Sequence, residues 1–318
     1  MRFKAGTARL ARIETGNETY RITTRDDAAS LVASIETCGL INPPILLATD
    51  RGSHIIVCGF RRIDACGRMG RERIDARILE AGTAPGQCAL VAIGDNCFQR
   101  ELNLIETARA LNLLTAVLPD DAAVMDAAGR LGLPAAATTL SKIRSLASLP
   151  IPLQRGLIEG ALSLPMAERL QQMPAEEAME SYGLFREIRA GLNIQREILD
   201  NAEECALREG VSLREVLRSE SLVAIRTSAD LDRSRKIALV RKLLRKRRYP
   251  ALTRAEKRFA RYSGELGLRR DMKLVPPAGF EGPDYSLSLR FRSPGQLREQ
   301  KEAIERMLAG DALRTILD

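Results

Sequence analysis

A glycine followed by two arginines, in the stretch Gly59-Phe60-Arg61-Arg62, is the first candidate for chemistry in this chain. The β-branched run at 54–57 predicts a strand before it, and the apolar residues from Ile63 to Met69 have the spacing of a short helix after it. A glycine lets the backbone approach a ligand closely, while a helix N-terminus and guanidinium groups both favour phosphate. The stretch therefore predicts a phosphate-binding turn, although two solvated arginines on a surface helix would have the same sequence.

A second polar cluster contains Asp95, Asn96, Gln99 and Arg100, and we expect it at the start of a helix over 105–118. Magnesium ions in proteins are commonly held by one or two carboxylates together with phosphate oxygens. A carboxylate, amides and an arginine in one cluster could thus hold a metal ion and a polyphosphate together. The alternative interpretation is an ordinary polar capping segment of the helix.

The composition favours a soluble protein with an anionic partner. The chain has 318 residues, a formal net charge of +8 and a pI of about 9.4, and 45% of its residues are hydrophobic. This length suffices for two or three domains, and the basic balance favours nucleic acid or another anion. The six cysteines form no CxxC pair and there is one histidine, which argues against a zinc site. No apolar run is long enough to span a membrane, so we expect a cytoplasmic protein.

An α+β region must position the candidate residues. Between the N-terminal segment and residue 82, the pattern predicts a helix over 26–37 and strands over 45–47, 54–57 and 74–79. Gly39 ends the predicted helix, and the two prolines that follow it fit such a stop. The glycine–arginine stretch then lies between the second and third of these strands.

A helix, a tight turn and a second helix are predicted over 122–131, 132–134 and 135–149. The length and the turn glycine fit a DNA-binding helix-turn-helix, although a plain pair of antiparallel helices has the same pattern. The second helix offers five candidates for contacts in a DNA groove, which are Thr138, Thr139, Ser141, Lys142 and Arg144.

The segment 225–273 is strongly basic, with seventeen lysines and arginines against five acids, an excess of +12. Because a solvated helix face usually mixes charges of both signs, this excess favours contact with nucleic acid over a merely basic surface. The DNA-binding candidates in this segment are Arg241, Lys242, Arg245, Lys246, Arg247 and Arg248.

The C-terminal tail changes its period. Residues 285–291 alternate between polar and apolar side chains, as in a half-buried strand, and could pair with 273–275. A final helix is predicted to begin after Ser293. One hairpin and one helix bury too little apolar surface to be stable alone. The tail should therefore either form a dimer or pack on the preceding helices.

Three motifs, taken in order, resemble the N-terminal boxes of the ParB family. They are Gly39-Leu40-Ile41-Asn42-Pro43, then Gly59-Phe60-Arg61-Arg62-Ile63-Asp64-Ala65, then Asp95-Asn96 with Arg100 and Leu102-Asn103. The resemblance continues through the helix-turn-helix to the run Gly160-Ala161-Leu162-Ser163-Leu164-Pro165. It implies an α+β ParB/sulfiredoxin-like nucleotide-binding domain followed by a mostly α-helical body. The implied parts are the N-terminal domain (1–108), a helix-turn-helix domain (109–175), a helical basic region (176–272) and a ββα dimerisation segment (273–318).

The resemblance implies a protein of plasmid or chromosome partitioning that binds double-stranded DNA as a homodimer. Members of the family bind CTP with Mg²⁺ to control a clamp on DNA and hydrolyse it, and a Walker-type partition ATPase commonly acts on them. A cytoplasmic location on the nucleoid or a plasmid follows. Two other functions stay open, namely a ParB-like transcriptional regulator without nucleotide binding and a nucleotide-dependent small-molecule kinase of the same fold.

By position, the resemblance assigns Asp95 to the metal, and Asp95 and Asn96 to catalysis. The nucleotide-binding positions that it implies are Gly39, Leu40, Ile41, Asn42, Pro43, Gly59, Phe60, Arg61, Arg62, Asn96, Gln99 and Arg100. The sequence departs from the family pattern in three places, since Phe60 replaces a glutamate, Asn42 replaces a glutamine, and Gln99-Arg100 lies one position late. Because Phe60 carries no charge, we expect nucleotide binding with CTP hydrolysis that is slow or absent.

Overall fold

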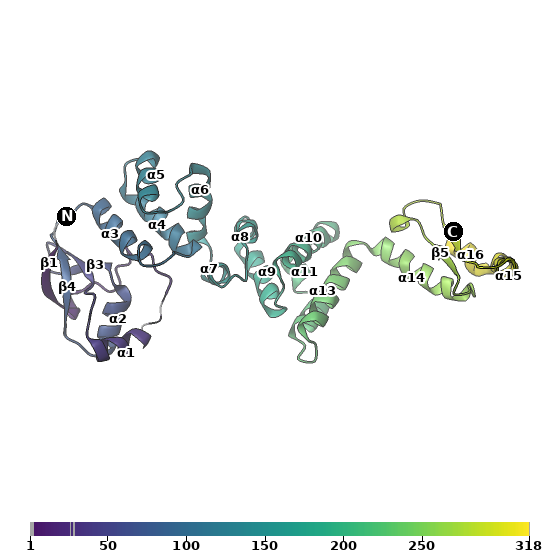
Figure 1. The fold of residues 1–318 in the computed structure, drawn as a ribbon, viewed down its shortest axis with the longest axis horizontal. Coiled ribbons are helices and arrows are strands. Elements are labelled where there is room, and N and C mark those ends of the chain that lie inside the picture. Colours follow the sequence, from purple (N-terminus) through teal and green to yellow (C-terminus); the bar gives the residue numbers. More distant parts are fainter. Residues whose placement is uncertain (1–2, 26, 28, 318) are drawn as a thin grey trace. The chain divides into compact units, whose positions relative to one another are not determined.

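The structure is a computed structural model that describes residues 3–25, 27 and 29–317 (Figure 1). The chain divides into two compact units, Met1–Tyr182 and Gly183–Asp318. Within the described residues, no helix combines the length and the apolar character needed to cross a membrane.

A four-stranded sheet forms the core of the first unit, with the order β1-β4-β2-β3. Its strands are β1 (Lys4–Arg9), β2 (Ile45–Ala48), β3 (His54–Cys58) and β4 (Arg73–Leu79). β1 lies antiparallel to β4, β2 lies parallel to β4, and β3 lies antiparallel to β2. Parallel neighbours need a crossover connection, and here the chain between β2 and β4 supplies β3 and the helix α2 (Phe60–Arg68). The three strands predicted over 45–47, 54–57 and 74–79 are thereby confirmed.

Strand β1 has no counterpart among the predicted strands. Its inward-facing residues are Gly6 and Ala8, which are too small to produce an apolar alternation in the sequence. The close packing needs that size, because a Cβ on Gly6 would lie 3.2 Å from Cδ1 of Ile78 on β4. A strand whose buried face is made of small residues is therefore invisible to hydrophobic periodicity.

Helices cover this sheet and form the rest of the first unit (Figure 1). The predicted helix 26–37 corresponds to α1 (Ala29–Cys38), and its predicted start at Asp26 lies outside the described residues. The apolar run at 88–93 belongs to α3 (Pro85–Cys97), which contacts β3 and the next helix, α4 (Leu104–Val117). α4 begins with a capping box, in which Asn103 and Glu106 accept each other's backbone N–H groups.

The predicted helix–turn–helix is present as α5 (Asp121–Arg130) and α6 (Ala137–Ser145), both of which pack on α4. Gly132 in the turn has φ +71°, which explains the glycine. A 3₁₀ turn, η2 (Leu146–Ser148), ends the second helix earlier than predicted. The first unit continues with α7 (Ile151–Ile158) and α8 (Leu164–Gln171), and α9 (Ala175–Glu187) contains the division between the units.

The second unit begins with a helical body. Its helices are α10 (Leu192–Glu209), α11 (Leu213–Leu217), α12 (Glu220–Thr227), α13 (Arg233–Arg248) and α14 (Pro250–Glu265). The basic helix α13 packs on α10, and its Val240 and Leu244 are fully buried. The thiol of Cys205 on α10 donates to the backbone carbonyl of Leu244 at 3.5 Å.

The tail forms the predicted hairpin, in which β5 (Met272–Val275) and β6 (Ser286–Leu289) pair antiparallel. A 3₁₀ turn, η3 (Ala278–Phe280), lies between the two strands. The helices α15 (Pro294–Ala309) and α16 (Asp311–Leu317) follow the hairpin. Leu266, Leu274, Met307 and Ile316 form a buried cluster against which Phe259 of α14 packs. Of the two expected ways to cover the tail, packing on the preceding helix is therefore present within one chain.

Candidate functional site

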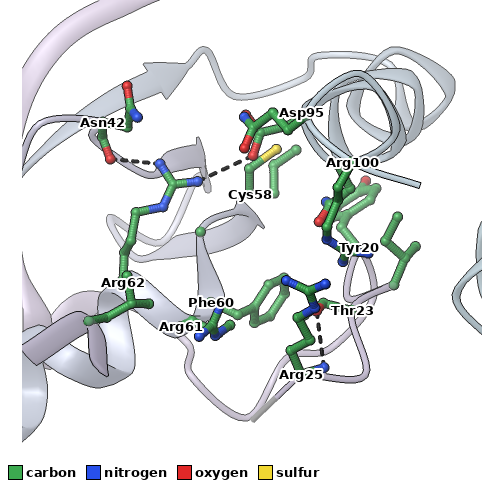
Figure 2. A pocket seen from close by; sticks show the side chains of 16 residues that line it. Tyr20, Thr23, Arg25, Asn42, Cys58, Phe60, Arg61, Arg62, Asp95 and Arg100 are labelled. Carbon is green, nitrogen blue, oxygen red and sulfur yellow. Dashed lines mark hydrogen bonds and ion pairs between the residues drawn. The ribbon is translucent and has the colours of Figure 1, made fainter. Parts of the chain in front are cut away.

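A cavity of about 450 Å³ opens between the N-terminus of α2 and the C-terminus of α3, and the segment 20–25 forms another wall (Figure 2). It brings together nine of the predicted site residues, which are Asn42, Gly59, Phe60, Arg61, Arg62, Asp95, Asn96, Gln99 and Arg100. Four arginines and one carboxylate line it among the residues that the structure describes there. This balance fits a polyanionic ligand.

The loop before β2 contributes less than predicted. Of the five residues from Gly39 to Pro43, only Asn42 lines the cavity. Leu40 packs on the core of the sheet, and the side chain of Ile41 is 72% exposed. Gly39 has φ +73° and serves the turn after α1. The other four residues of this loop do not line the cavity, so their contacts with a nucleotide stay predictions.

Gly59 makes the turn from β3 into α2 possible. Its φ is +93°, and a Cβ there would lie 2.8 Å from the Cβ of Pro44. A side chain would therefore both strain the backbone and collide with the loop. The helix α2 that follows has no side-chain cap at its N-terminus, which lines the cavity. Sharp turn, helix N-terminus and two arginines coincide here as the sequence predicted.

Arg62 links three segments of the site (Figure 2). Its Nη1 donates to the backbone carbonyl of Asn42 at 2.6 Å, and its Nη2 lies 3.2 Å from Oδ2 of Asp95. The two ion-paired side chains are only 20% and 26% exposed. The other oxygen of Asp95 accepts from Nε2 of Gln99 at 3.3 Å. The carboxylate predicted to bind the metal is thus ion-paired with an arginine predicted to bind phosphate.

Phe60 and Arg61 directly precede Arg62 at the start of α2. The Nε of Arg61 donates to the backbone carbonyl of Asp27 at 3.0 Å, so its guanidinium lies at the rim of the cavity. Phe60 packs partly on the core of the sheet, with the guanidinium of Arg21 5.8 Å from its ring centroid. The ring can neither polarise a water molecule nor bind a metal ion.

Asp95 and Asn96 lie in the last turn of α3, not at the start of α4 as predicted. The reason is that the apolar run before them continues as helix into the polar residues, while Asn103 provides the cap for α4. Asn96 donates from Nδ2 to the carbonyl of Ala92 at 2.9 Å.

Arg100 lines the cavity but is held by Glu106. Its two terminal nitrogens donate to the two carboxylate oxygens of Glu106 at 2.6 and 2.8 Å. Burial alone would raise the pKa of the Glu106 carboxyl, but hydrogen bonds from Arg100 and from the backbone of Thr24 and Asn103 outweigh it and hold that pKa below its ordinary value. Glu106 therefore ties α4 to the segment 20–25, and Arg100 both holds Glu106 and lines the cavity.

The segment 20–25 was missed from the sequence, yet Tyr20, Thr23 and Arg25 line the cavity. Burial raises the pKa of Tyr20 to about 12, so its phenol stays neutral. Burial also raises the pKa of the Cys58 thiol, which makes it an uncharged part of the wall. No local pattern marks these residues, because they reach the site through the packing of α4 on an irregular segment.

The DNA-binding candidates on α6 and on α13 differ in how far their side chains are free to contact a partner. On α6, Thr138, Thr139, Ser141 and Lys142 are exposed, whereas Arg144 is half-buried. The Nε of Arg144 donates to Oδ1 of Asn112 on α4 at 3.1 Å, so this arginine helps to hold α6 on α4.

On α13 the arginines are largely neutralised. Acids lie close to four of them, in the pairs Arg241–Glu197 at 2.8 Å, Arg245–Glu256 at 2.9 Å, Arg247–Glu209 at 2.6 Å and Arg248–Glu204 at 3.8 Å. Three of these acids come from α10, far away in the sequence. Lys242 and Lys246 have no carboxylate partner within the described part of the chain. The segment is basic, but less of its charge is available than its sequence indicates.

Comparison with known proteins shows which part of the chain is similar to a known family. Residues 7–96 match the model of the ParB N-terminal domain. The matched residues include the end of β1, the strands β2 to β4, the Gly59 turn and the acid–amide pair at the end of α3. The match to the ParB N-terminal domain therefore covers the part of the chain in which the three motifs resemble that family.

Two curated proteins are similar to this chain over about half of its length. The chain is 28% identical over 172 residues to the probable chromosome 1-partitioning protein ParB of Deinococcus radiodurans. This alignment covers 54% of this chain and 56% of that protein. It is 31% identical over 156 residues to the nucleoid occlusion protein of Bacillus cytotoxicus. That alignment covers 48% of this chain and 51% of the relative. The chain spans about half the length of the curated relatives it matches.

Solved structures of ParB proteins are also similar, at low identity. C-terminally truncated ParB from Caulobacter crescentus complexed with CTP-γ-S is 21% identical, covers 56% of this chain and 98% of the solved chain, and has a TM-score of 0.27. The same protein complexed to the centromeric parS site is 18% identical, with 67% and 96% coverage and a TM-score of 0.33.

Proposed function

We propose that this chain is a DNA-binding partitioning protein whose N-terminal cavity binds a nucleoside triphosphate together with Mg²⁺. The observation that carries the proposal is the cavity itself, in which four arginines and one carboxylate surround the Gly59 turn. Guanidinium groups and an open helix N-terminus are the donors that phosphates need. The choice of CTP rests on the ParB resemblance.

The donor set fits this ligand. Arg62 donates to a neutral backbone carbonyl as well as to Asp95, and a phosphate is a stronger acceptor than a carbonyl. Asp95 is the only carboxylate lining the described cavity, which suits an ion held mainly by phosphate oxygens and water. A bound Mg²⁺ would neutralise phosphate charge and remove the repulsion between the triphosphate and Asp95.

We expect binding to outlast hydrolysis. An acid at position 60 could orient or polarise a water molecule, and Phe60 cannot. Asp95 and Asn96 are the remaining candidates for catalysis, and Asp95 is occupied by Arg62 in this structure. The nucleotide should therefore act as a switch ligand with slow turnover.

DNA contact is proposed for the exposed face of α6, with Lys142 as its charge, and for the lysines of α13. A homodimer is proposed through the tail, where Leu297 of α15 is 40% exposed beside an apolar cavity of about 650 Å³. A partition ATPase is the partner that the family resemblance suggests. A clamp on DNA would depend on these DNA contacts and on the homodimer.

The proposal is tested by measuring binding of the chain to long duplex DNA with and without CTP and Mg²⁺, by fluorescence anisotropy. Nucleotide should change the DNA affinity or its lifetime, and ATP should do so less. If DNA binding is tight but identical under all these conditions, a ParB-like regulator without nucleotide control takes the place of the clamp.

A further inference from the structure

A second cavity of the first unit, about 220 Å³ in volume, shares Thr23 with the arginine cavity. It is formed by residues of the segment 18–24 and of the helices α4 and α7. Three arginines line it, namely Arg21, Arg109 and Arg155, and Glu18 is the one carboxylate among the described lining residues. None of its arginines was predicted to belong to a site.

The positive charge of this cavity is only partly balanced. Arg21 is ion-paired with Glu18 at 2.5 Å. Arg109 donates to the backbone carbonyl of Thr23 at 3.1 Å and to Oε1 of Gln154 at 3.3 Å, and both acceptors are neutral. Arg155 is exposed, and no ion pair to it is present within the described chain. Two guanidinium charges thus face the cavity without a carboxylate partner.

The cationic side chain of Arg109 is held firmly in place. Gln154, which accepts from it, is 5% exposed and donates its own amide hydrogens to the carbonyls of Ala147 and Leu149 at 3.1 and 2.8 Å. The amide orientation is therefore fixed by the core, and it fixes the guanidinium in turn. A charge that is positioned before a ligand arrives loses little entropy on binding.

Two isoleucines border the same cavity. Ile151 and Ile158, two turns apart on α7, are 53% and 41% exposed and both line it. Arg155 lies between them on the helix. An exposed apolar pair beside unbalanced arginines is typical of a protein interface, where arginine and large apolar residues are enriched. Duplex DNA offers phosphates to the arginines but little to the isoleucines.

We infer that this cavity and the exposed face of α7 bind an acidic peptide segment of a protein partner, with one of its carboxylates between Arg109 and Arg155 and an apolar side chain against Ile151 and Ile158. The cavity is large enough for one or two side chains and small for a nucleotide. Because Thr23 also lines the arginine cavity, the docked segment lies next to the nucleotide site. The inference does not depend on nucleotide binding.

The test is a selection of short random peptides displayed on phage against the full chain, followed by anisotropy with the synthetic consensus peptide. The recovered peptides should be enriched in aspartate and glutamate next to leucine, isoleucine or phenylalanine. Arg155→Glu should weaken the Kd of the consensus peptide by about tenfold or more. The pair Ile151→Ser with Ile158→Ser should weaken it by about fivefold. These side chains are exposed, so the variants should fold.

The matched control is Arg51→Glu, which makes the same charge change in the exposed turn between β2 and β3 and should alter the Kd by less than about twofold. Three results would overturn the inference. They are recovered peptides without acidic residues, an equal loss of affinity in Arg51→Glu, and a chain that selects no peptide while Arg155→Glu weakens binding to duplex DNA. The last result would assign Arg155 to a phosphate contact.

Discussion

Asp95→Asn should make nucleotide binding less dependent on magnesium. Nη2 of Arg62 lies 3.2 Å from the Asp95 carboxylate, and both side chains are mostly buried. Before Arg62 can contact a phosphate, this charged hydrogen bond must be given up, at a cost of about 1.5 kcal/mol. Without Mg²⁺ the carboxylate would also repel the incoming triphosphate. The amide in Asp95→Asn keeps the shape of the side chain. It removes both the cost of breaking the ion pair with Arg62 and the repulsion of the triphosphate.

We therefore expect Asp95→Asn to bind CTP without Mg²⁺ about tenfold more tightly than the wild type does, from the 1.5 kcal/mol above. With Mg²⁺ the advantage should disappear, since the wild type gains a metal contact that the variant lacks. Calorimetric titrations of both proteins, with EDTA and with Mg²⁺, measure the crossing of the two affinities.

The matched control is Asp64→Asn, which makes the same change on α2 in a surface pair with Arg68 at 2.9 Å. Its nucleotide affinity should equal that of the wild type under both conditions, because exposed pairs contribute little. If Asp95→Asn gains nothing in EDTA, the ion pair does not oppose nucleotide binding and the reasoning from the geometry of Arg62 is refuted.

Four further outcomes are expected. Gly59→Ala should lower stability by about 1–3 kcal/mol through its φ of +93° and the contact with the loop, seen as a lower Tm, whereas Gly67→Ala, with open space, should not. Lys142→Ala should weaken binding to the cognate DNA more than to random DNA in anisotropy titrations. Stability supplied by Glu106 is complete above the unfolded carboxyl pKa of about 4.3 and is lost as pH falls through its lower folded pKa, so Glu106→Gln should flatten the acid limb of a Tm–pH curve. Leu297→Asp should shift sedimentation towards the monomer if the tail forms the dimer.

The parts of the fold that sequence alone could predict have strong local signals. The β-branched run of β3 and the glycine at 59 each announce their structure, because a strand needs such side chains and the turn tolerates no Cβ. The meeting of the Arg61-Arg62 stretch with Asp95 could be expected only through the ParB resemblance, since the two lie on different helices.

What could not be predicted depends on long-range packing. The small residues of β1 give no periodic signal, and the irregular segment 20–25 is held at the site by distant residues such as Glu106 and Arg109. The charge on α13 could be counted from the sequence but its neutralisation could not, since Glu197 and Glu209 lie 44 and 38 residues before their partners in the chain. A net charge in the sequence therefore overstates the charge that a partner meets.

The most direct test of the account is calorimetric titration of the purified chain with CTP in the presence of Mg²⁺, with ATP and with CTP in EDTA as comparisons. The account predicts saturable binding of CTP with Mg²⁺, weaker binding of ATP, and a loss of about 30- to 100-fold in Arg62→Ala, equal to 2–3 kcal/mol for a charged donor. If the wild type binds no nucleotide up to about millimolar concentration, a free energy near −4 kcal/mol, the arginine cavity serves another purpose and the central claim is contradicted.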